Sequence, residues 1–208
     1  MPRSVLTAAD LEGIAAGGEV TITAGTLVTP LAREEAERRR ITLRIAEEAP
    51  ARGQRDGRRV VALAADHGGY ELKEQLKGHL RDWGYAVLDL GTDSTAAVDY
   101  PDFAEAAANA VARGEAWRGV VIDSAGIGSA IAANKVPGVR AALCYDRATA
   151  RNSREHNDAN LLSLGARMIP AEVAREILAV WLETLFAGGR HQRRVDKISA
   201  IEERHTKK

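Results

Sequence analysis

The chain has 208 residues, enough for one α/β domain with a small appendage and too few for two large domains. Twenty-nine Lys and Arg residues balance 29 Asp and Glu residues, which excludes a globally basic nucleic-acid binder and an acidic solvating tail. The single cysteine, Cys144, has no intrachain disulfide partner, and no apolar run approaches the ~20 residues of a membrane span. We therefore expect a soluble cytoplasmic protein with neither a membrane nor a nucleic acid as its partner.

Residues 1–48 are expected to form a small module, and residues 49–58 a linker, because EEAPARGQRDGRR is charged and almost without apolar side chains. Within the module, Thr7 and Asp10 are spaced like a helix cap, with LEGIAA as its continuation. VTIT and ITLRI alternate like strands, and Thr29 with Pro30 opens a helix over LAREEAERRR. A module of this size is marginal alone, so we expect it to dock on something.

From residue 59 to 208 the pattern is regular and predicts one domain. Five short apolar runs are typical of buried strands: VVALAA (60–65), YAVLDLG (85–91), GVVID (119–123), VRAALCY (139–145) and NLLSLGA (160–166). Helical segments separate them: YELKEQLKGHLRDW, PDFAEAAANAVARG, IGSAIAANK, a stretch from about Asp146 to Glu155, and finally AEVAREILAVWLETLF. This alternation predicts an α/β fold with a parallel sheet covered on both faces.

Ligands of such sheets bind outside the carboxyl ends of the strands. Polar or glycine residues stand at these ends and at the end of the helix after the fourth strand: Asp66, His67, Tyr100, Asp123, Ser124, Gly126, Gly128, His156 and Asn157. The glycine turn after Asp123 can hold an anion with its amides, or it can simply be a tight turn. A dinucleotide site, with Asp146 on a ribose, remains an alternative, although Ile131 stands where a small residue is needed.

The tail GGRHQRRV places Arg190, His191 and Arg194 close together, a combination that suits a phosphate monoester. The alternative is a solvated basic terminus. No two His or Cys residues have zinc-like spacing, so no metal is expected, and the G-x-S-x-G elbow of hydrolases is missing.

Seven segments in order, across about residues 59–205, resemble the type B ribose-5-phosphate isomerase and galactose-6-phosphate isomerase family: ADHGGYELK, DLGT, VDYPDFA, GIGSAIAANK, GVRAALC, REHNDAN and GGRHQRRV. The resemblance implies a Rossmann-like three-layer sandwich and a homodimer or tetramer whose site is shared between subunits. It also implies isomerisation of a phosphorylated sugar between aldose and ketose forms through a cis-enediolate, without metal or cofactor.

The same resemblance implies a role for each matching residue. His156 opens the sugar ring and Asp66 assists it. Asn157 and the amides of Gly126–Gly128 hold sugar oxygens. The residues expected to bind phosphate or line the substrate site are His67, Tyr100, Ser124, Arg190, His191 and Arg194.

One departure concerns the base that removes the proton from carbon. The family usually has Cys where this chain has Asp123, and a subgroup has Glu where this chain has Ser129. A carboxylate is a competent base for this transfer, because it is ionised at neutral pH. Three outcomes stay open: Asp123 is the base, the turn is reshaped for another sugar phosphate, or the protein binds sugar phosphates without catalysis. Cys144 lies within a strand and is expected to be packed.

The run LVTPLAREEA in the N-terminal module faintly resembles N-terminal segments of enzymes from bacterial microcompartments. Such a segment predicts a targeting or docking role toward a shell or cargo protein. A stabilising appendage is the alternative.

Overall fold

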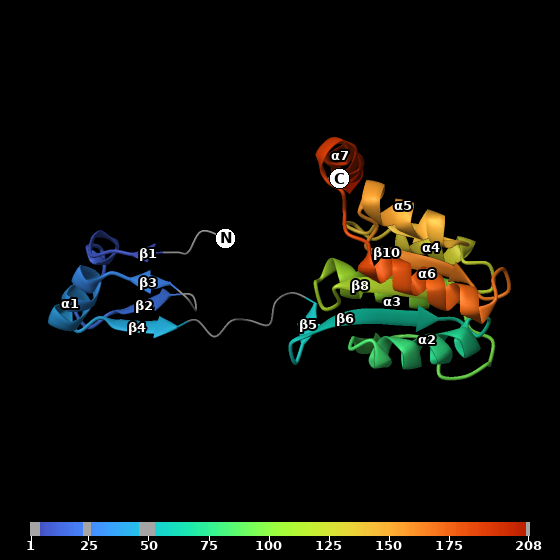
Figure 1. Ribbon diagram of the computed structural model, residues 1–208, viewed down its shortest axis with the longest axis horizontal. Coiled ribbons are helices and arrows are strands. Elements are labelled where there is room, and N and C mark those ends of the chain that lie inside the picture. Colours follow the sequence, from blue (N-terminus) through green and yellow to red (C-terminus); the bar gives the residue numbers. More distant parts are fainter. Residues whose placement is uncertain (1–4, 23–25, 46–52, 207–208) are drawn as a thin grey trace. The chain divides into compact units, whose positions relative to one another are not determined.

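The computed structural model describes residues 5–22, 26–45 and 53–206, and the chain divides into two compact units, Met1–Ala51 and Arg52–Lys208 (Figure 1). Residues 46–52, the first part of the predicted linker included, lie outside the described residues. The rest of that linker differs from the prediction, because strand β5 (Gln54–Arg55) pairs antiparallel with the beginning of strand β6. A tight turn at Asp56 and Gly57, both at positive φ, joins the two strands.

The C-terminal unit is built on the predicted parallel sheet. Its strands are β6 (Arg58–Ala65), β7 (Ala86–Asp89), β8 (Arg118–Asp123), β9 (Ala141–Leu143) and β10 (Leu161–Gly165). They lie side by side in the order β7-β6-β8-β10-β9, and every pair among them is parallel. All of their carboxyl ends therefore meet at one edge of the sheet, where ligands of open α/β sheets bind.

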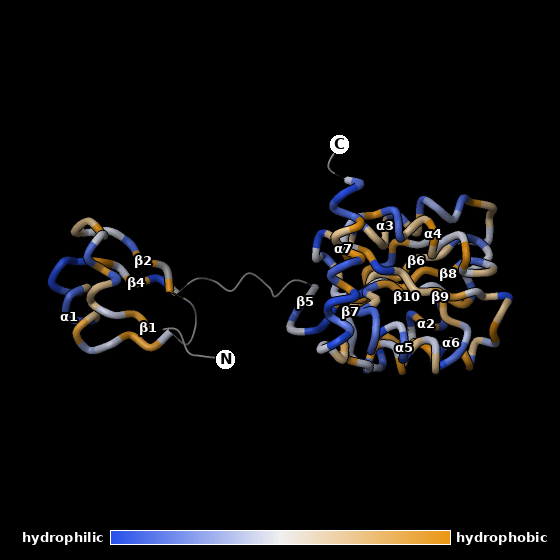
Figure 2. Tube along the Cα trace, turned by 90° about the horizontal axis from the view of Figure 1, so that it is seen from above, coloured by the Kyte–Doolittle hydropathy of each residue, from blue (hydrophilic) through white to orange (hydrophobic). Residues whose placement is uncertain are grey.

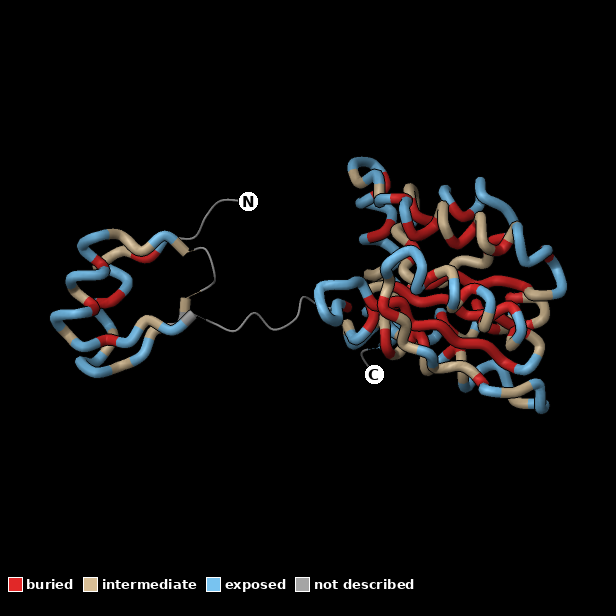
Figure 3. Tube along the Cα trace, turned by 60° about the horizontal axis from the view of Figure 1, so that its bottom comes forward, coloured by how far each residue is buried: buried red, intermediate tan, exposed pale blue. Residues whose placement is uncertain are grey.

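Helices cover both faces of this sheet, as predicted. They are α2 (Tyr70–Asp82), α3 (Tyr100–Ala112), α4 (Ile127–Ala133), α5 (Arg147–Asn157) and α6 (Ala171–Glu183). Figure 2 shows α3 and α4 on one side of the apolar sheet and α2, α5 and α6 on the other. Alternate side chains of β6 point to opposite faces of the sheet. Val61 and Leu63 pack on the face covered by α2, α5 and α6, whereas Ala62 and Ala64 pack on the face covered by α3 and α4. In Figure 3 the strands form the continuously buried centre of the unit.

The C-terminal segment is a helix that the sequence analysis did not predict. A short 3₁₀ turn, η2 (Gly189–His191), leads into α7 (Gln192–Thr206). Only Val195 of α7 is buried, while Ile198 and Ile201 are 45% and 50% exposed. The basic residues of this segment favoured a phosphate-binding tail. The apolar residues, which recur every three residues and are typical of a helix, were not used in the prediction.

Two buried arginines fix the end of α6 and the segment that follows it. Arg118, 3% exposed, donates to the carbonyl oxygens of Trp181 at 2.6 Å and Leu182 at 2.9 Å. Arg154 and Arg118 share the carbonyl oxygen of Thr184, at 3.3 and 3.2 Å. These carbonyls lack partners within the helix, so the guanidinium groups satisfy them and set the direction in which the chain leaves α6.

The N-terminal unit holds two parallel strand pairs: β1 (Val5–Leu6) with β3 (Leu27–Val28), and β2 (Glu19–Ile22) with β4 (Thr42–Ile45). Helix α1 (Pro30–Arg39) begins as predicted, since the Thr29 hydroxyl accepts from Ala32 N at 3.3 Å. Asp10 accepts from Thr7, but only the 3₁₀ turn η1 (Ala9–Leu11) follows instead of the predicted longer helix. The core of this unit consists of Leu6, Leu11, Ala32, Ala36 and Ile41.

Candidate active site

The carboxyl edge of the sheet gathers one group of the predicted site residues. Asp66, at the end of β6, is 6% exposed and accepts from Gly69 N at 3.0 Å through Oδ1. The next residue, His67, is held by the backbone of Val98, whose oxygen and nitrogen lie 3.2 and 3.3 Å from Nδ1. The other Asp66 oxygen lies 4.0 Å from that nitrogen. A carboxylate and an imidazole therefore share one strand end, with part of each left available to a ligand.

Asp123 ends strand β8 and is enclosed by donors. Its Oδ1 accepts from Ala125 N at 2.7 Å and from Gly126 N, and its Oδ2 accepts from Ser129 N at 3.0 Å and Ser129 Oγ at 2.5 Å. The side chain is buried, with 5% exposure of the residue. A carboxylate has about four acceptor positions, and here four donors occupy them. The carboxylate thus organises the turn between β8 and α4.

The glycine turn approaches its neighbours too closely for side chains. Gly126 has a φ of +79°, and a Cβ on it would lie 2.6 Å from Leu143 Cδ1. A Cβ on Gly128 would lie 2.6 Å from the ring of Tyr100, so that ring covers the turn. The Gly126 amide already donates to Asp123, which corrects the expectation that it holds a sugar oxygen. Among the described residues, no acceptor is found for the amide of Gly128.

A cavity of about 480 Å³ opens beside His67. Arg167, two residues beyond strand β10, lines it together with Glu71, Gln75 and Thr95. Arg167, beyond the end of the fifth predicted strand, is not among the predicted site residues, which include strand-end residues of the first four strands only. The same rule that selected Asp66 and Asp123 would have found it. An exposed guanidinium beside a histidine makes this cavity suitable for an anionic group.

The other predicted residues lie at the end of α5 and in the segment that leads into α7. The rings of His156 and His191 stack with centroids 4.2 Å apart and planes 5° apart. Arg190 Nε donates to His191 Nε2 at 3.4 Å. Burial lowers the pKa of His191, and the neighbouring charges of His156, Arg190 and Arg194 lower it further. A hydrogen bond of 3.0 Å from Ala187 N to Glu155 O ties this segment to α5.

The two groups stand at opposite edges of the sheet. Helix α5 starts beyond the carboxyl end of β9 and runs back toward the amino edge of the sheet, where β10 begins. Its 11 residues span about 16 Å at 1.5 Å per residue. Its last residues, His156 and Asn157, are therefore at the amino edge; Figure 1 shows the nearby α7 toward the end of the unit at which β6 starts. This corrects the expectation that the end of α5 belongs with the strand ends. Within one chain, His156 and Arg190 do not meet Asp66 and Asp123.

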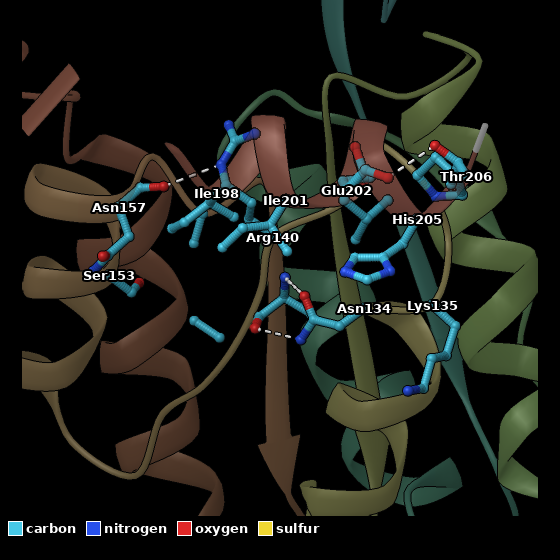
Figure 4. Close-up of a pocket in the computed structure, with 15 residues that line it drawn as sticks. Asn134, Lys135, Arg140, Ser153, Asn157, Ile198, Ile201, Glu202, His205 and Thr206 are labelled. Atoms are coloured by element: carbon cyan, nitrogen blue, oxygen red, sulfur yellow. Dashed lines mark hydrogen bonds between the residues drawn. The ribbon is translucent and has the colours of Figure 1, made fainter. Parts of the chain in front are cut away.

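A groove of about 630 Å³ lies beside the second group, between α7 and the segment around β9. Figure 4 shows Ile198 and Ile201 of α7 facing Arg140 and Asn134 across it. Arg140 Nε donates to the carbonyl oxygen of Asn157 at 3.1 Å, so the wall of the groove continues into the end of α5. Apolar side chains of this size, exposed on a helix beside a groove, are typical of an interaction surface.

Two other residues considered in the sequence analysis, Asp146 and Cys144, have structural roles. Asp146 caps α5, accepting from Thr149 N at 2.7 Å, and the backbone and side chain of Thr149 lower its pKa. The cap therefore gives Asp146 a structural role that needs no dinucleotide. Cys144 is fully buried, and burial raises its pKa.

Across residues 5–22, 26–45 and 53–206, no group of three or more His, Cys, Asp or Glu residues is arranged to hold a metal ion. No helix in those ranges has the length and apolar character of a membrane span.

The fold and these two groups define a class: a parallel α/β domain with a polar strand-end site and a basic C-terminal segment suited to a phosphorylated small molecule. The model of the ribose/galactose isomerase family matches residues 61–198, and the chain belongs to that family. Ribose-5-phosphate isomerase B of Escherichia coli is 44% identical over 144 residues, covering 69% of this chain and 97% of the E. coli protein.

Two further relatives agree with this assignment. D-erythrulose-4-phosphate isomerase of Pectobacterium atrosepticum is 39% identical over 143 residues, 68% of this chain and 94% of that protein. The structure of ribose-5-phosphate isomerase B from Clostridium thermocellum superposes with a TM-score of 0.70 and 49% identity, over 70% of this chain and 99% of that one. All three similarities leave out a part of this chain about the size of the N-terminal unit.

Proposed function

We propose that this protein interconverts the aldose and ketose forms of a phosphorylated sugar, with ribose 5-phosphate and ribulose 5-phosphate as the first substrates to test. The observation that carries the proposal is the near-complete coverage of ribose-5-phosphate isomerase B at 49% identity. The family match spans residues 61–198, which belong to the unit that holds both residue groups. The reaction needs a ring-opening acid, a base on carbon, donors for the enediolate oxygens and a phosphate clamp. The two groups together offer each of these functional groups.

The active form is a homodimer, or a tetramer built from such dimers, with sites shared between two copies. The support is topological, because Asp66 and Asp123 lie at one edge of the sheet and His156 and Arg190 at the other. A two-fold axis would bring the carboxyl edge of one copy to the C-terminal segment of the other and create two equal sites. The exposed Ile198 and Ile201 supply an apolar surface for that contact.

In such a site each residue has a separate task. His156 gives a proton to the ring oxygen while Asp66 accepts the proton of the anomeric hydroxyl. Arg190 and Arg194 clamp the phosphate, because planar guanidinium groups pair with its oxygens. Tyr100, Ser124, Asn157 and the Gly128 amide face the sugar, and His67 and His191 stand beside its anionic end.

Asp123 is the base on carbon in this proposal, although its carboxylate already accepts four hydrogen bonds and must free an oxygen to act. Ser129→Ala releases one of the two bonds to Oδ2. If Asp123 is the base, this variant keeps most of its activity, whereas Asp123→Asn loses ~10²–10⁴-fold in kcat. Deuterium exchange at C1 of ribulose 5-phosphate in heavy water measures the step directly. Equal exchange in wild type and Asp123→Asn would move the base elsewhere.

The shared site is tested by co-expressing Asp123→Asn with His156→Asn. Each variant alone forms dimers with two damaged sites, whereas a mixed dimer has one intact and one doubly damaged site. Random pairing predicts about one quarter of wild-type activity from the mixture, well above either variant alone. Activity that equals the average of the two separate variants contradicts a shared site.

A panel of aldose and ketose phosphates with four to six carbons identifies the substrate. The second candidate function, binding without catalysis, is favoured by the complete enclosure of Asp123. It predicts saturable binding of a sugar phosphate, visible as thermal stabilisation, with no exchange of carbon-bound protons for any member of the panel.

The N-terminal unit has a function separate from the chemistry, namely docking onto a shell or cargo protein of a microcompartment within the cytoplasm. Its support is the resemblance of LVTPLAREEA to such segments and the exposure of Val5, Leu27 and Leu31 at 51%, 51% and 65%. Fusing residues 1–51 to a fluorescent protein tests whether this segment directs the fusion to the compartment. Uniform cytoplasmic fluorescence in cells with visible compartments contradicts the docking role.

A further inference from the structure

One side chain outside the predicted site contacts the ring-opening histidine. Asn152 stands four residues before His156 on α5, so both project from the same side of the helix. The Asn152 amide nitrogen Nδ2 lies 2.8 Å from His156 Nδ1. An amide nitrogen can only donate, so Nδ1 accepts and the ring proton of the neutral imidazole resides on Nε2. Among the described residues, none hydrogen-bonds to that Nε2.

A second contact holds the plane of the same ring. His191 stacks on it at 4.2 Å and is only 7% exposed, which leaves little room for either ring to turn. Arg190 donates to His191 Nε2, so the proton of neutral His191 belongs on Nδ1, a buried atom with no partner in the described chain. The amide contact in its plane and the stacked ring on its face together fix both the tautomer and the orientation of His156.

We propose that Asn152 is a positioning residue for ring opening, holding His156 as the tautomer that presents Nε2–H to the ring oxygen of the sugar. This inference rests on the proposed function, in which His156 opens the ring. In that step the C1–O4 bond breaks, O4 receives the proton from Nε2, and the C1 hydroxyl gives its proton to Asp66 of the other copy as the C1=O bond forms. His156 is left as an imidazolate, which the Asn152 amide N–H on Nδ1 stabilises, and it regains its proton from Asp66 through solvent. The opposite tautomer has no proton on Nε2 and cannot start the step as an acid.

The consequence is a defect confined to cyclic substrates. Ribose 5-phosphate closes a ring through O4 and needs ring opening before its C2 proton can move. Ribulose 5-phosphate carries its phosphate on O5 and stays open, so exchange of its C1 protons bypasses His156 as a ring-opening acid. A residue that only supported the fold or the carbon base would change both rates together.

The experiment compares wild type with Asn152→Leu, which has nearly the same size but no amide, and with Arg151→Leu as a control at an exposed position of the same helix. We expect Asn152→Leu to lower kcat for ribose 5-phosphate ~10- to 100-fold, as for other residues that orient a catalytic group. Deuterium exchange at C1 of ribulose 5-phosphate should stay within about twofold of wild type. Asn152→Gln should recover part of the loss, and Arg151→Leu should change neither rate.

Nitrogen NMR of ¹⁵N-histidine-labelled protein gives a readout independent of activity. We expect the Nε2–H tautomer of His156 in wild type and a mixture in Asn152→Leu. The Nδ1–H tautomer in wild type, an equal fall of both rates, or two unchanged rates would each overturn the proposal. If wild type exchanges no proton of any sugar phosphate, the proposed function fails instead, and the NMR spectrum still decides whether Asn152 sets the tautomer.

Discussion

Replacing Arg118 by Met should destabilise the C-terminal unit strongly although the residue touches no part of the proposed site. Its guanidinium is buried between two rings, 4.1 Å from the Trp117 centroid and 5.0 Å from that of Trp181. Burial, followed by the charge of Arg154, lowers the pKa of Arg118 to about 9, so the side chain is charged at pH 7. Met keeps the aliphatic stem and its packing but removes the donors and the charge.

The magnitude follows from the groups left behind. The carbonyl oxygens of Trp181 and Leu182 lose a donor, at ~1–3 kcal/mol each, whereas Thr184 keeps its bond from Arg154. Loss of the contacts with the two rings adds ~1 kcal/mol, and release from the cost of burying a charge offsets part of the sum. We expect a net loss of about 3 kcal/mol, or a fall in Tm of roughly 6–12 °C.

The assay is urea unfolding followed by tryptophan fluorescence, because Trp83, Trp117 and Trp181 are the three tryptophans of the chain and all belong to the C-terminal unit. The matched control is Arg113→Met, which removes an ion pair with Glu115 whose arginine side chain is 63% exposed and should cost less than ~0.5 kcal/mol. If Arg118→Met unfolds within ~1 kcal/mol of wild type, the capping argument for the end of α6 is refuted.

Three further predictions concern acid stability, phosphate and the N-terminal unit. Burial raises the pKa of Asp89, but hydrogen bonds from two lysines outweigh burial, so the pKa in the folded protein is lowered. The ionised Asp89 therefore contributes fully to the free energy of unfolding above the unfolded pKa of ~3.9, and this contribution is lost as pH falls through the folded pKa. Asp89→Asn removes one of the carboxylates that pair with the buried Lys73. This variant should lower the free energy of unfolding by ~2 kcal/mol at pH 7 and by less at pH 3. Urea titrations at both pH values measure the difference. Arg190→Ala or Arg194→Ala should raise KM for the sugar phosphate about tenfold or more in steady-state assays, with poor rescue by Lys. Deleting residues 1–51 should leave the tryptophan-detected Tm unchanged within ~2 °C, because the two units have separate cores.

The sheet and its helices could be predicted because each of the five parallel strands is a short apolar run and some of the helices have a start signal of their own. Pro101 within α3 and the Asp146 cap of α5 are examples. The segment around β5 could not be predicted, because its composition is that of a linker and its strand forms only by pairing with Arg58 and Arg59. Helix α7 was missed because the arginines of its first turn favoured a basic phosphate-binding tail, although Val195, Ile198 and Ile201 recur at helical spacing.

Candidate residues for the site could be named from the sequence, but their placement could not be predicted. The strand-end rule places Asp66 and Asp123 together because every parallel strand ends at the same edge. It says nothing of His156, whose edge depends on the length of α5 and on the direction in which the helix returns. Asn152 gave no signal on its own. Its meaning comes only from the spacing of four residues to His156, the histidine that the family resemblance assigns to ring opening.

Asp123 shows most clearly how a residue can occupy an expected position with altered chemistry. A thiol at this position would be a poor hydrogen-bond acceptor and would leave the amides of Ala125, Gly126 and Ser129 free for a ligand. The carboxylate instead accepts from all three amides and from the Ser129 hydroxyl, and so it stabilises the turn with the donors that an enediolate would use. For Asp123 to accept a proton from carbon, at least one of these bonds must break or lengthen as substrate binds. The Ser129 hydroxyl is the donor that can turn away by rotation of its side chain alone, whereas the amides are fixed by the backbone. If Asp123 is the carbon base, its basicity is therefore coupled to the Ser129 rotamer, and this coupling separates the present turn from one built around a cysteine.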